Sequence, residues 1–154
     1  MSIYLYRGGE KLVGRSGVGQ AIRHQEVCLR RAGVPLTDRW TGDTAAVHVN
    51  TVLPDSVVTA LAAKLRGRKV VWYGHSTMED FRGSFRGSDQ LAPLFRRWII
   101  FCYGLGDVVL TPTEYARGLL EGYGLKRPVY SISTGVDTSF FRPDPSLRVT
   151  FRRR

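Results

Sequence analysis

The chain has 154 residues, of which 43% are hydrophobic, and this composition supports one folded domain and excludes a disordered tail. The net charge is +10, with 23 Lys and Arg against 13 Asp and Glu, which favours anionic partners such as phosphorylated ligands, nucleic acid or acidic lipid headgroups. The solvated surface of an arginine-rich protein explains the same charge, so charge alone decides nothing.

The first half of the chain alternates short apolar runs with helical patterns. Residues 3–6 predict a strand, and a glycine-rich connection follows it as far as Gly19. A helix then begins after Ser16, a suitable N-cap, and ends before Gly33. The buried stripe expected for this helix is Val18, Ala21, Ile22, Gln25, Cys28, Leu29 and Ala32. Residues 47–49 predict the second strand.

The second half of the chain continues this alternation. A helix that opens at Pro54 or Asp55 is expected to bury Val58, Leu61, Ala62 and Leu65. Residues 69–73 are nearly all apolar, which indicates a strand covered on both faces. The remaining elements are a polar loop at 74–88, a helix at 89–103, a strand at 107–110, a helix capped by Thr111 or Thr113 that ends near 122–124, and a strand at 129–132.

This order of elements predicts an α/β fold, a Rossmann-like parallel sheet with helices on both faces and right-handed crossovers. Ligands bind such sheets at the carboxyl ends of the strands. The loops with distinctive chemistry all follow strands: the glycine-rich loop, His75-Ser76, Thr111-Pro112-Thr113 and Thr134-Gly135-Val136-Asp137. We therefore expect one functional cleft at this edge of the sheet.

Four residues open the first helix and are candidates for binding a phosphate: Ser16, Gly17, Val18 and Gly19. Free backbone N–H groups and the helix dipole attract anions there, and glycine lets a ligand approach the backbone closely. The segment is neither G-x-G-x-x-G, because Ile22 stands at the third glycine position, nor a P-loop, because Gln20 follows. A tight turn that enters a helix explains the same residues.

His75 directly follows the third strand and is the candidate catalytic residue. Its ring would face the cleft, where it can contact a sugar hydroxyl or transfer a proton, although a histidine that merely caps the strand is the alternative. His24 and His48 fit structural positions. No Ser-His-Asp or Cys-His arrangement and no metal-ligand spacing is recognisable, so we expect no metal site.

The loop after His75 carries three candidates for binding an acceptor: Glu79, Asp80 and Arg82. A local ion pair between Asp80 and Arg82 or Arg86 is an equal alternative. The helix at 89–103 has an apolar stripe, which we expect to pack in the core, made up of Leu91, Leu94, Phe95, Trp98, Ile99, Cys102 and Leu105. Arginines and aromatics interleave around it and suit a membrane interface, so membrane contact would fall to the loop and the arginines.

The two cysteines, Cys28 and Cys102, fall on apolar faces of predicted helices and form no C-x-x-C pair. We expect buried free thiols, which fits a reducing compartment. The N-terminal apolar run is too short for a secretion signal, and no stretch approaches the ~20 apolar residues of a membrane span. We therefore expect a cytoplasmic protein that is soluble or peripheral to a membrane.

Four segments together resemble the N-terminal domain of glycosyltransferase family 4, a retaining family with the GT-B fold. They are Ser-Gly-Val-Gly-Gln-Ala-Ile at 16–22, Gly-His-Ser-Thr-Met-Glu-Asp-Phe-Arg at 74–82, Asp-Val-Val-Leu-Thr-Pro-Thr-Glu-Tyr-Ala at 107–116, and Ile-Ser-Thr-Gly-Val-Asp-Thr-Ser-Phe-Phe-Arg-Pro-Asp at 132–144. The last is similar to the family's Asn-Gly-Val-Asp…Phe-x-Pro segment, with Thr134 where asparagine is usual. The segment at 74–82 most resembles Gram-positive enzymes that glucosylate diacylglycerol.

The resemblance implies a role for each candidate. The backbone at 17–19 would approach the donor diphosphate, His75 would contact the transferred sugar, and Glu79, Asp80 and Arg82 would lie toward the acceptor. Thr134, Gly135 and Asp137 would line the cleft. The donor would be a nucleotide-sugar, with UDP-glucose as the first candidate, and no other cofactor would be needed. The leaving phosphate would take the acceptor's proton, so that the protein acts mainly by positioning.

The resemblance also divides the chain. Residues 1–143 would form the N-terminal GT-B domain, residues 144–154 would begin the interdomain linker, and the C-terminal donor-binding domain would be absent. Half a cleft cannot hold both substrates, so we expect negligible transfer by this chain alone. Its partners would be the nucleotide-sugar, a lipid acceptor or anionic membrane surface on the inner face of the plasma membrane, and the missing domain.

Two other classes of protein remain open. One is a non-catalytic basic module that binds anionic membrane or nucleic acid, with nucleic acid disfavoured because no stacking platform or known motif is present. The other is a different Rossmann-like enzyme that uses a nucleotide cofactor. The absence of G-x-G-x-x-G and the segment Thr134-Gly135-Val136-Asp137 argue against that enzyme.

Overall fold

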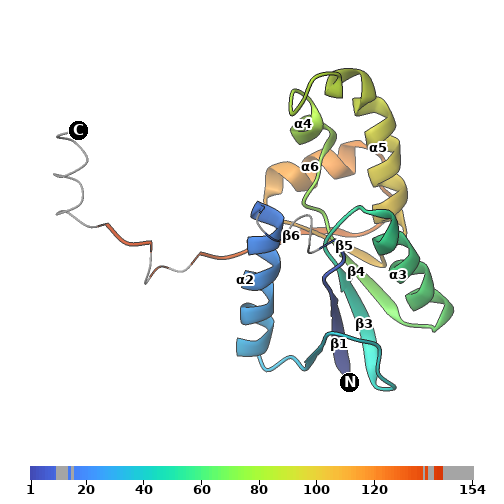
Figure 1. The fold of residues 1–154 in the computed structure, drawn as a ribbon, viewed down its shortest axis with the longest axis vertical. Coiled ribbons are helices and arrows are strands. Elements are labelled where there is room, and N and C mark those ends of the chain that lie inside the picture. Colours follow the sequence, from blue (N-terminus) through green and yellow to red (C-terminus); the bar gives the residue numbers. More distant parts are fainter. Residues whose placement is uncertain (10–13, 15, 137, 139–140, 144–154) are drawn as a thin grey trace.

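The computed structural model describes residues 1–9, 14, 16–136, 138 and 141–143. Asp137, predicted for the cleft loop, and residues 144–154, predicted as a linker, lie outside these residues. The elements follow in the order β1 Ser2–Tyr6, α2 Gly17–Arg31, β2 Leu36–Thr37, β3 Thr44–Val49, α3 Pro54–Leu65, β4 Lys69–Tyr73, α4 Met78–Phe81, α5 Ser88–Gly104, β5 Val108–Thr111, α6 Glu114–Gly122 and β6 Val129–Ser131 (Figure 1).

The strands form one parallel sheet in the order β2-β1-β3-β4-β5-β6, which confirms the predicted α/β class. The chain leaves β1 toward β2 at one edge and then returns to β3 on the other side of β1. This reversal makes a switch point between β1 and β3, and ligands of open α/β sheets bind outside the carboxyl ends of the strands at such a point. Arg7 and Asn50 follow these two ends.

Helices cover both faces of the sheet, as predicted, but unequally. Alternate strand residues such as Val49, Trp72 and Val109 form a buried core with residues of α3, α5 and α6, including Ala60, Ile99 and Leu120. The opposite face, which carries Leu5, is covered by α2 beside β1 and β2. Figure 1 shows α2 on one side of the sheet and α3 and α5 on the other.

Side-chain caps fix the ends of several helices where the sequence predicts them. Ser16 caps α2 by accepting a hydrogen bond from the Gly19 N–H at 3.4 Å, and Thr113 caps α6 by accepting one from the Ala116 N–H at 3.1 Å. Gly33 follows α2 with a φ of +71°, the left-handed conformation expected just beyond a helix end. Two elements were not predicted: the two-residue β2, and α4 inside the supposed loop at 74–88.

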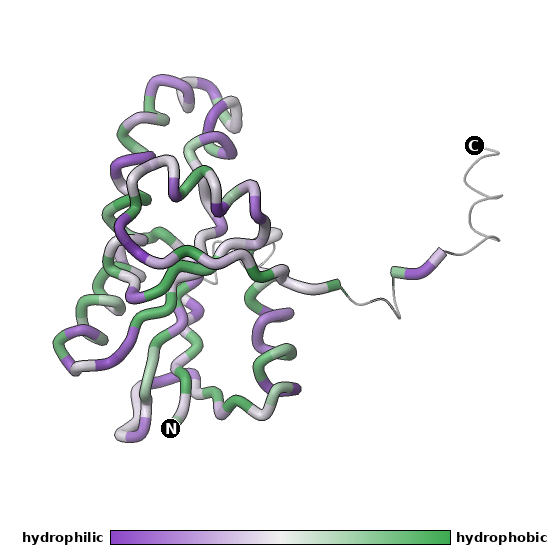
Figure 2. The backbone as a smooth tube through the Cα atoms, turned by 180° about the vertical axis from the view of Figure 1, so that it is seen from behind, coloured by the Kyte–Doolittle hydropathy of each residue, from purple (hydrophilic) through white to green (hydrophobic). Residues whose placement is uncertain are grey.

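The predicted buried stripe of α3 is wrong. Val58, Leu61 and Leu65 are exposed, whereas Ser56, Ala60 and Ala63 face the sheet. Ser56 also hydrogen-bonds Thr51 at 2.6 Å between the two hydroxyl oxygens. The small side chains let α3 lie close to β3 and β4, so the large ones point to solvent. Figure 2 shows hydrophobic and hydrophilic residues alternating along the helices. Which of these residues are exposed depends on the rotation of each helix about its own axis.

The stripe on α5 is buried only in part. Ile99 and Cys102 lie in the core, as predicted, but Leu91 and Leu94 are 48% and 65% exposed. Trp98 lies between these two regions and donates its indole N–H to the Val52 carbonyl oxygen at 2.7 Å. This bond ties α5 to the loop after β3 and turns the leucines of its first turns outward.

The two cysteines differ, so the expectation of two buried thiols is half wrong. Cys102 is fully buried in the core, and burial raises the pKa of its thiol to about 12. Cys28 is exposed, as is Ala32, because both lie on the flank of α2 rather than on the side that faces the sheet. Gly135 lies beside Cys28, since a Cβ added to this glycine would lie 3.9 Å from the Cys28 sulfur.

Candidate active site

His75 leaves the sheet at the carboxyl end of β4. Gly74, the residue before it, donates its N–H to the Leu110 carbonyl oxygen at 2.7 Å and is fully surrounded. A Cβ on Gly74 would lie 3.2 Å from Leu120 Cδ1 and 3.4 Å from Tyr103 Cζ, so glycine allows the close approach of α6 and α5 there. The half-buried His75 ring then stacks on Tyr73, with ring centroids 4.4 Å apart.

Asn50 at the end of β3 orients the imidazole of His75. His75 Nε2 lies 3.2 Å from Asn50 Oδ1. A carbonyl oxygen only accepts, so Nε2 carries the proton and donates, which leaves Nδ1 as a hydrogen-bond acceptor. Burial lowers the pKa of His75 to about 4, so the ring is neutral at pH 7. His75 can therefore bind a hydroxyl without presenting a positive charge.

Two buried nitrogens beside His75 have no hydrogen-bond partner among the described residues: Asn50 Nδ2 and His48 Nε2. His48 is buried in β3 and its ring lies near-parallel to Tyr73, at 6.1 Å between centroids, as expected for a structural position. Burial, and secondarily His75, lower the pKa of His48 to about 4. Asn50 was missed in the sequence, where its only signal is a polar residue directly after a strand at the switch point.

The loop after His75 is held by buried tyrosines and a helix cap. Tyr103 donates its hydroxyl to the Ser76 carbonyl oxygen at 2.9 Å and accepts from the Ser76 N–H at 3.2 Å. Thr77 caps α4 by accepting from the Asp80 N–H at 3.2 Å, and its hydroxyl donates to the Asp80 carboxylate at 2.8 Å. Asp80 is thus paired with Thr77, and within the described residues it makes no ion pair with an arginine.

Glu79 is held by Tyr123, the residue that follows α6. Tyr123, at the end of α6, donates its hydroxyl to the Glu79 carboxylate and accepts from the Met78 N–H at 3.0 Å. The Arg96 guanidinium lies 4.8 Å from the centre of the Tyr123 ring, in a cation–π contact. Burial, then Glu79, raises the pKa of Tyr123. Arg82 follows α4 and is exposed.

The residues predicted to bind phosphate form the start of α2. Gly17 is its first residue, Val18 is half-buried and Gly19 is buried. The first turn of α2 contains no acidic side chain, so no carboxylate of that turn offsets the positive, N-terminal end of the helix dipole. The last turn carries Arg30 and Arg31, which suit the negative, C-terminal end. In Figure 1 α2 begins at the end of the sheet where β1 ends.

Thr134 and Gly135 follow β6 and lie beside α2. A pocket of about 280 Å³ separates them from α2 and is lined by His24, Val27, Cys28, Arg31, Thr134, Gly135, Val136 and Thr138. Gly135 has a φ of +76°, a conformation that favours glycine. The structure thus brings His75 together with Asn50, and Thr134 and Gly135 together with α2.

The profile of Glycosyltransferase Family 4 matches residues 28–140. The chain belongs to glycosyltransferase family 4. It is 33% identical over 139 residues to the processive diacylglycerol alpha-glucosyltransferase of Acholeplasma laidlawii, and the match covers 89% of this chain and 40% of that protein.

Solved structures of Anabaena Alr3699/HepE show the same fold as this family 4 chain. The complex with UDP and glucose matches with a TM-score of 0.65 and 12% identity, and the complex with UDP-glucose matches with a TM-score of 0.65 and 13% identity. Each match covers 99% of this chain and 49% of the other. The chain therefore has the Rossmann-like half of a GT-B glycosyltransferase and spans less than half the length of these relatives.

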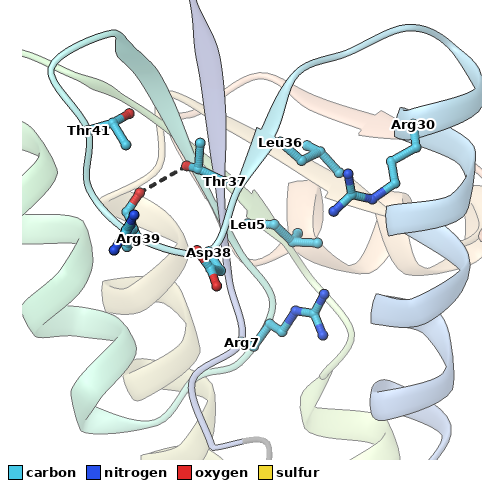
Figure 3. A pocket seen from close by; sticks show the side chains of 8 residues that line it. All are labelled: Leu5, Arg7, Arg30, Leu36, Thr37, Asp38, Arg39 and Thr41. Atoms are coloured by element: carbon cyan, nitrogen blue, oxygen red, sulfur yellow. Dashed lines mark hydrogen bonds between the residues drawn. The ribbon is translucent and has the colours of Figure 1, made fainter.

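A pocket of about 730 Å³ in this glycosyltransferase domain lies away from the predicted site, beside the edge strand β2 (Figure 3). In that view Arg30 extends from α2 toward Leu36, Arg7 lies below Leu5, and Arg39 lies on the side away from α2. Arg7 and Arg30 both pair with the carboxylate of Glu26, and Asp38 adds a second negative charge. With Arg39, three guanidinium groups stand against two carboxylates here, so the pocket keeps a small excess of positive charge.

No helix among the described residues has the length and apolar character that crossing a membrane requires. Within the same part of the chain, no three His, Cys, Asp or Glu side chains gather as metal ligands would.

Proposed function

We propose that this chain is the N-terminal half of a retaining glycosyltransferase that moves a hexose from a nucleotide-sugar to a lipid acceptor at an anionic membrane surface. The observation that carries the proposal is the pair of His75 and Asn50 at the carboxyl ends of neighbouring strands, in a chain of glycosyltransferase family 4. UDP-glucose is the proposed donor because the Anabaena protein binds it. A lipid acceptor is proposed because the Acholeplasma relative is a diacylglycerol glucosyltransferase.

The polar atoms of this pair suit a sugar. His75 Nδ1 is left as an acceptor and Asn50 Nδ2 as a donor, and a sugar hydroxyl both donates and accepts. A buried pair of this kind discriminates strongly, because a ligand without the hydroxyl would leave both groups unpaired. The neutral imidazole gives His75 the role of orienting the transferred sugar.

The other predicted residues take the roles that surround this pair. The start of α2, with Ser16, Gly17, Val18 and Gly19, would hold the donor diphosphate through backbone N–H groups. Glu79, Asp80 and Arg82 would contact the acceptor, and the hydrogen bonds from Tyr123 and Thr77 would hold the two carboxylates in place. The departing phosphate would take the acceptor's proton, so that no protein nucleophile is needed.

The second half of the cleft would come from a C-terminal domain. The chain matches 49% of the Anabaena structures and 40% of the Acholeplasma relative, so the remaining part of those proteins has no counterpart in it. We expect this chain alone to be inactive, because one side of a cleft does not orient both substrates.

A transfer assay tests the proposal with two proteins, this chain and this chain joined to the C-terminal half of the Acholeplasma relative. Both receive UDP-glucose and vesicles that contain diacylglycerol. We expect glucosyl transfer only by the joined protein, and we expect His75→Ala to lower kcat by ~10²-fold or more, the effect of removing one oriented polar group from an active site.

Lys126→Ala is the control. Lys126 is exposed and lies before the amino end of β6, whereas His75 follows the carboxyl end of β4. Full activity of His75→Ala would refute the role given to His75. No transfer by a folded joined protein, with tight and salt-sensitive vesicle binding by the short chain, would favour the basic binding module instead.

A further inference from the structure

An apolar groove of about 380 Å³ runs between α4 and α5. Five side chains line it: Phe81, Leu91, Leu94, Phe95 and Trp98. Phe81 stacks on Phe95 with ring centroids 4.2 Å apart and an interplanar angle of 13°, and Phe85 meets Phe81 edge-on at 5.3 Å. These ring contacts hold α4 against α5, so the groove is formed without a ligand.

The walls of this groove are open to solvent. Leu94 is 65% exposed and Leu91 48%, and Phe85, which packs edge-on against Phe81 beside the groove, is 51% exposed. Single exposed apolar side chains are common on protein surfaces, but a contiguous set that lines a groove marks a binding site. Every residue of the lining is apolar, so the group that fits it is a hydrocarbon chain rather than a sugar or a nucleotide.

Three arginines lie close in the chain to the aromatic residues of the groove: Arg82 follows Phe81, Arg86 follows Phe85, and Arg97 precedes Trp98. All three are exposed, and no hydrogen bond or ion pair engages their guanidinium groups among the described residues. The acidic side chains nearby already have partners, since Asp80 is bonded to Thr77, and Asp89 accepts the Gly83 N–H at 3.2 Å. These carboxylates keep their charge, but none of them pairs with the three guanidinium groups among the described residues, so the arginines are free to meet the phosphates of an anionic bilayer.

The groove continues directly from the proposed acceptor residues. Helix α4 begins three residues after His75 and carries Glu79 and Asp80 immediately before Phe81. Its four residues span about 6 Å at 1.5 Å per residue. Glu79, Asp80 and the groove residue Phe81 therefore belong to one helical turn, so a lipid whose polar end contacts these carboxylates would have its chain next to the groove.

We propose that the α4–α5 groove binds an acyl chain of the lipid acceptor, while Arg86 and Arg97 lie against the phosphate groups of the surrounding anionic bilayer. The proposal rests on the proposed function, because it takes the acceptor to be a lipid. It adds the site for the apolar part of that lipid. The exposed apolar residues of α3 lie outside this site.

Trp98 provides the measurement, because it lines the groove and its fluorescence is quenched by bromine in contact with it. The probe is a monoacylglycerol with a brominated chain, used below its critical micelle concentration so that no bilayer is present. The protein is the full chain with Trp40→Phe, which leaves Trp98 and the fully buried Trp72. We expect saturable quenching that is lost in the Trp98→Phe variant. Quenching only when vesicles are present would overturn the groove.

Leu94→Asp and Leu65→Asp form a matched pair, since both replace an exposed leucine on a helix of the same layer. We expect Leu94→Asp to weaken probe binding by ~10-fold or more, because it places a charge in an apolar site, and Leu65→Asp to change it less than ~2-fold. Equal weakening, or no weakening by Leu94→Asp, would overturn the proposal. Circular dichroism checks that each variant folds. Leu94→Met should bind the probe as the wild-type chain does, because methionine keeps an apolar side chain at this position.

Vesicles test the arginines separately. Arg86→Ala should weaken binding to vesicles that contain phosphatidylglycerol and leave binding to neutral phosphatidylcholine vesicles unchanged. Equal loss on both, or no loss on either, would overturn the role of Arg86.

The transfer assay separates this proposal from the proposed function. Transfer to diacylglycerol by the joined protein without probe binding would refute the groove alone. Saturable probe binding without transfer would refute the proposed function alone.

Discussion

The rings of His48 and His75 both lie near-parallel to the ring of Tyr73, at the end of the sheet. Burial lowers the pKa of both histidines, and His75 further opposes a charge on His48. Both rings are thus neutral in the folded protein. This arrangement provides a polar but uncharged wall, which suits a ligand that is itself uncharged at that point, such as a hexose ring.

Protonation of these histidines should make folding stability depend on pH. Their folded pKa values of about 4 lie below the ordinary 6.5, so the unfolded chain binds more protons between these values. The stabilisation is complete above pH ~6.5 and is lost as pH falls toward ~4, with each pKa unit worth about 1.4 kcal/mol. Urea unfolding at a series of pH values measures it.

The variant His48→Gln isolates the contribution of the more buried histidine. It should reduce the slope of the free energy of unfolding against pH between pH ~4 and ~6.5 by about half, because glutamine does not titrate while His75 still does. A wild-type free energy of unfolding that stays constant across that window would contradict the assignment of both rings as neutral and buried.

At the scale of one element, α3 inverts the usual arrangement of a surface helix. Its small residues Ser56, Ala60 and Ala63 face the sheet, and its large residues Val58, Leu61 and Leu65 face solvent. We expect Leu65→Lys to change the free energy of unfolding by less than about 0.5 kcal/mol, whereas Ala63→Leu should cost about 1–3 kcal/mol through overpacking. Thermal or chemical unfolding compares the two. A larger loss for Leu65→Lys would show that α3 packs on its other side.

The sequence located most elements because their signals are local. The strand at 69–73 matches β4, Pro54 opens α3, and Ser16 and Thr113 cap their helices as predicted. The rotation of α3 was not predictable, because residues 57–65 are apolar on nearly every side and leave no 3.6-residue period to follow. Fit to the sheet then decides which residues are buried.

The candidate site was predicted only in part. His75 was predicted because it directly follows a strand, and a parallel sheet gathers the residues that follow its strands at one edge. Asn50 lies in the same kind of position, but no motif marks it, and its pairing with His75 requires the strand order that places β3 beside β4. The partner of Glu79 was equally hidden, since Tyr123 lies more than forty residues further along the chain, whereas Thr77, the partner of Asp80, lies only three residues before it.

Over the whole molecule, the two faces of the sheet differ in how firmly they are covered. Three helices share one apolar core with the sheet, whereas α2 faces the other side with Ala21, Ile22 and Gln25 as buried residues beyond its first turn. The amide group of Gln25 is buried, and neither its nitrogen nor its oxygen has a partner among the described residues. Such a group costs free energy, so α2 is held less tightly than the helices opposite it.

That weak attachment matters because α2 also presents the proposed diphosphate site. Local opening of α2 should be frequent in the unliganded protein, and hydrogen exchange should report it as faster exchange of amides at 20–31 than of those at 57–65. In the joined protein, UDP should slow exchange in α2 and leave α3 unchanged, whereas equal protection of both helices would contradict this. Donor binding would then be coupled to the ordering of one helix, and part of the binding free energy would be spent on that ordering.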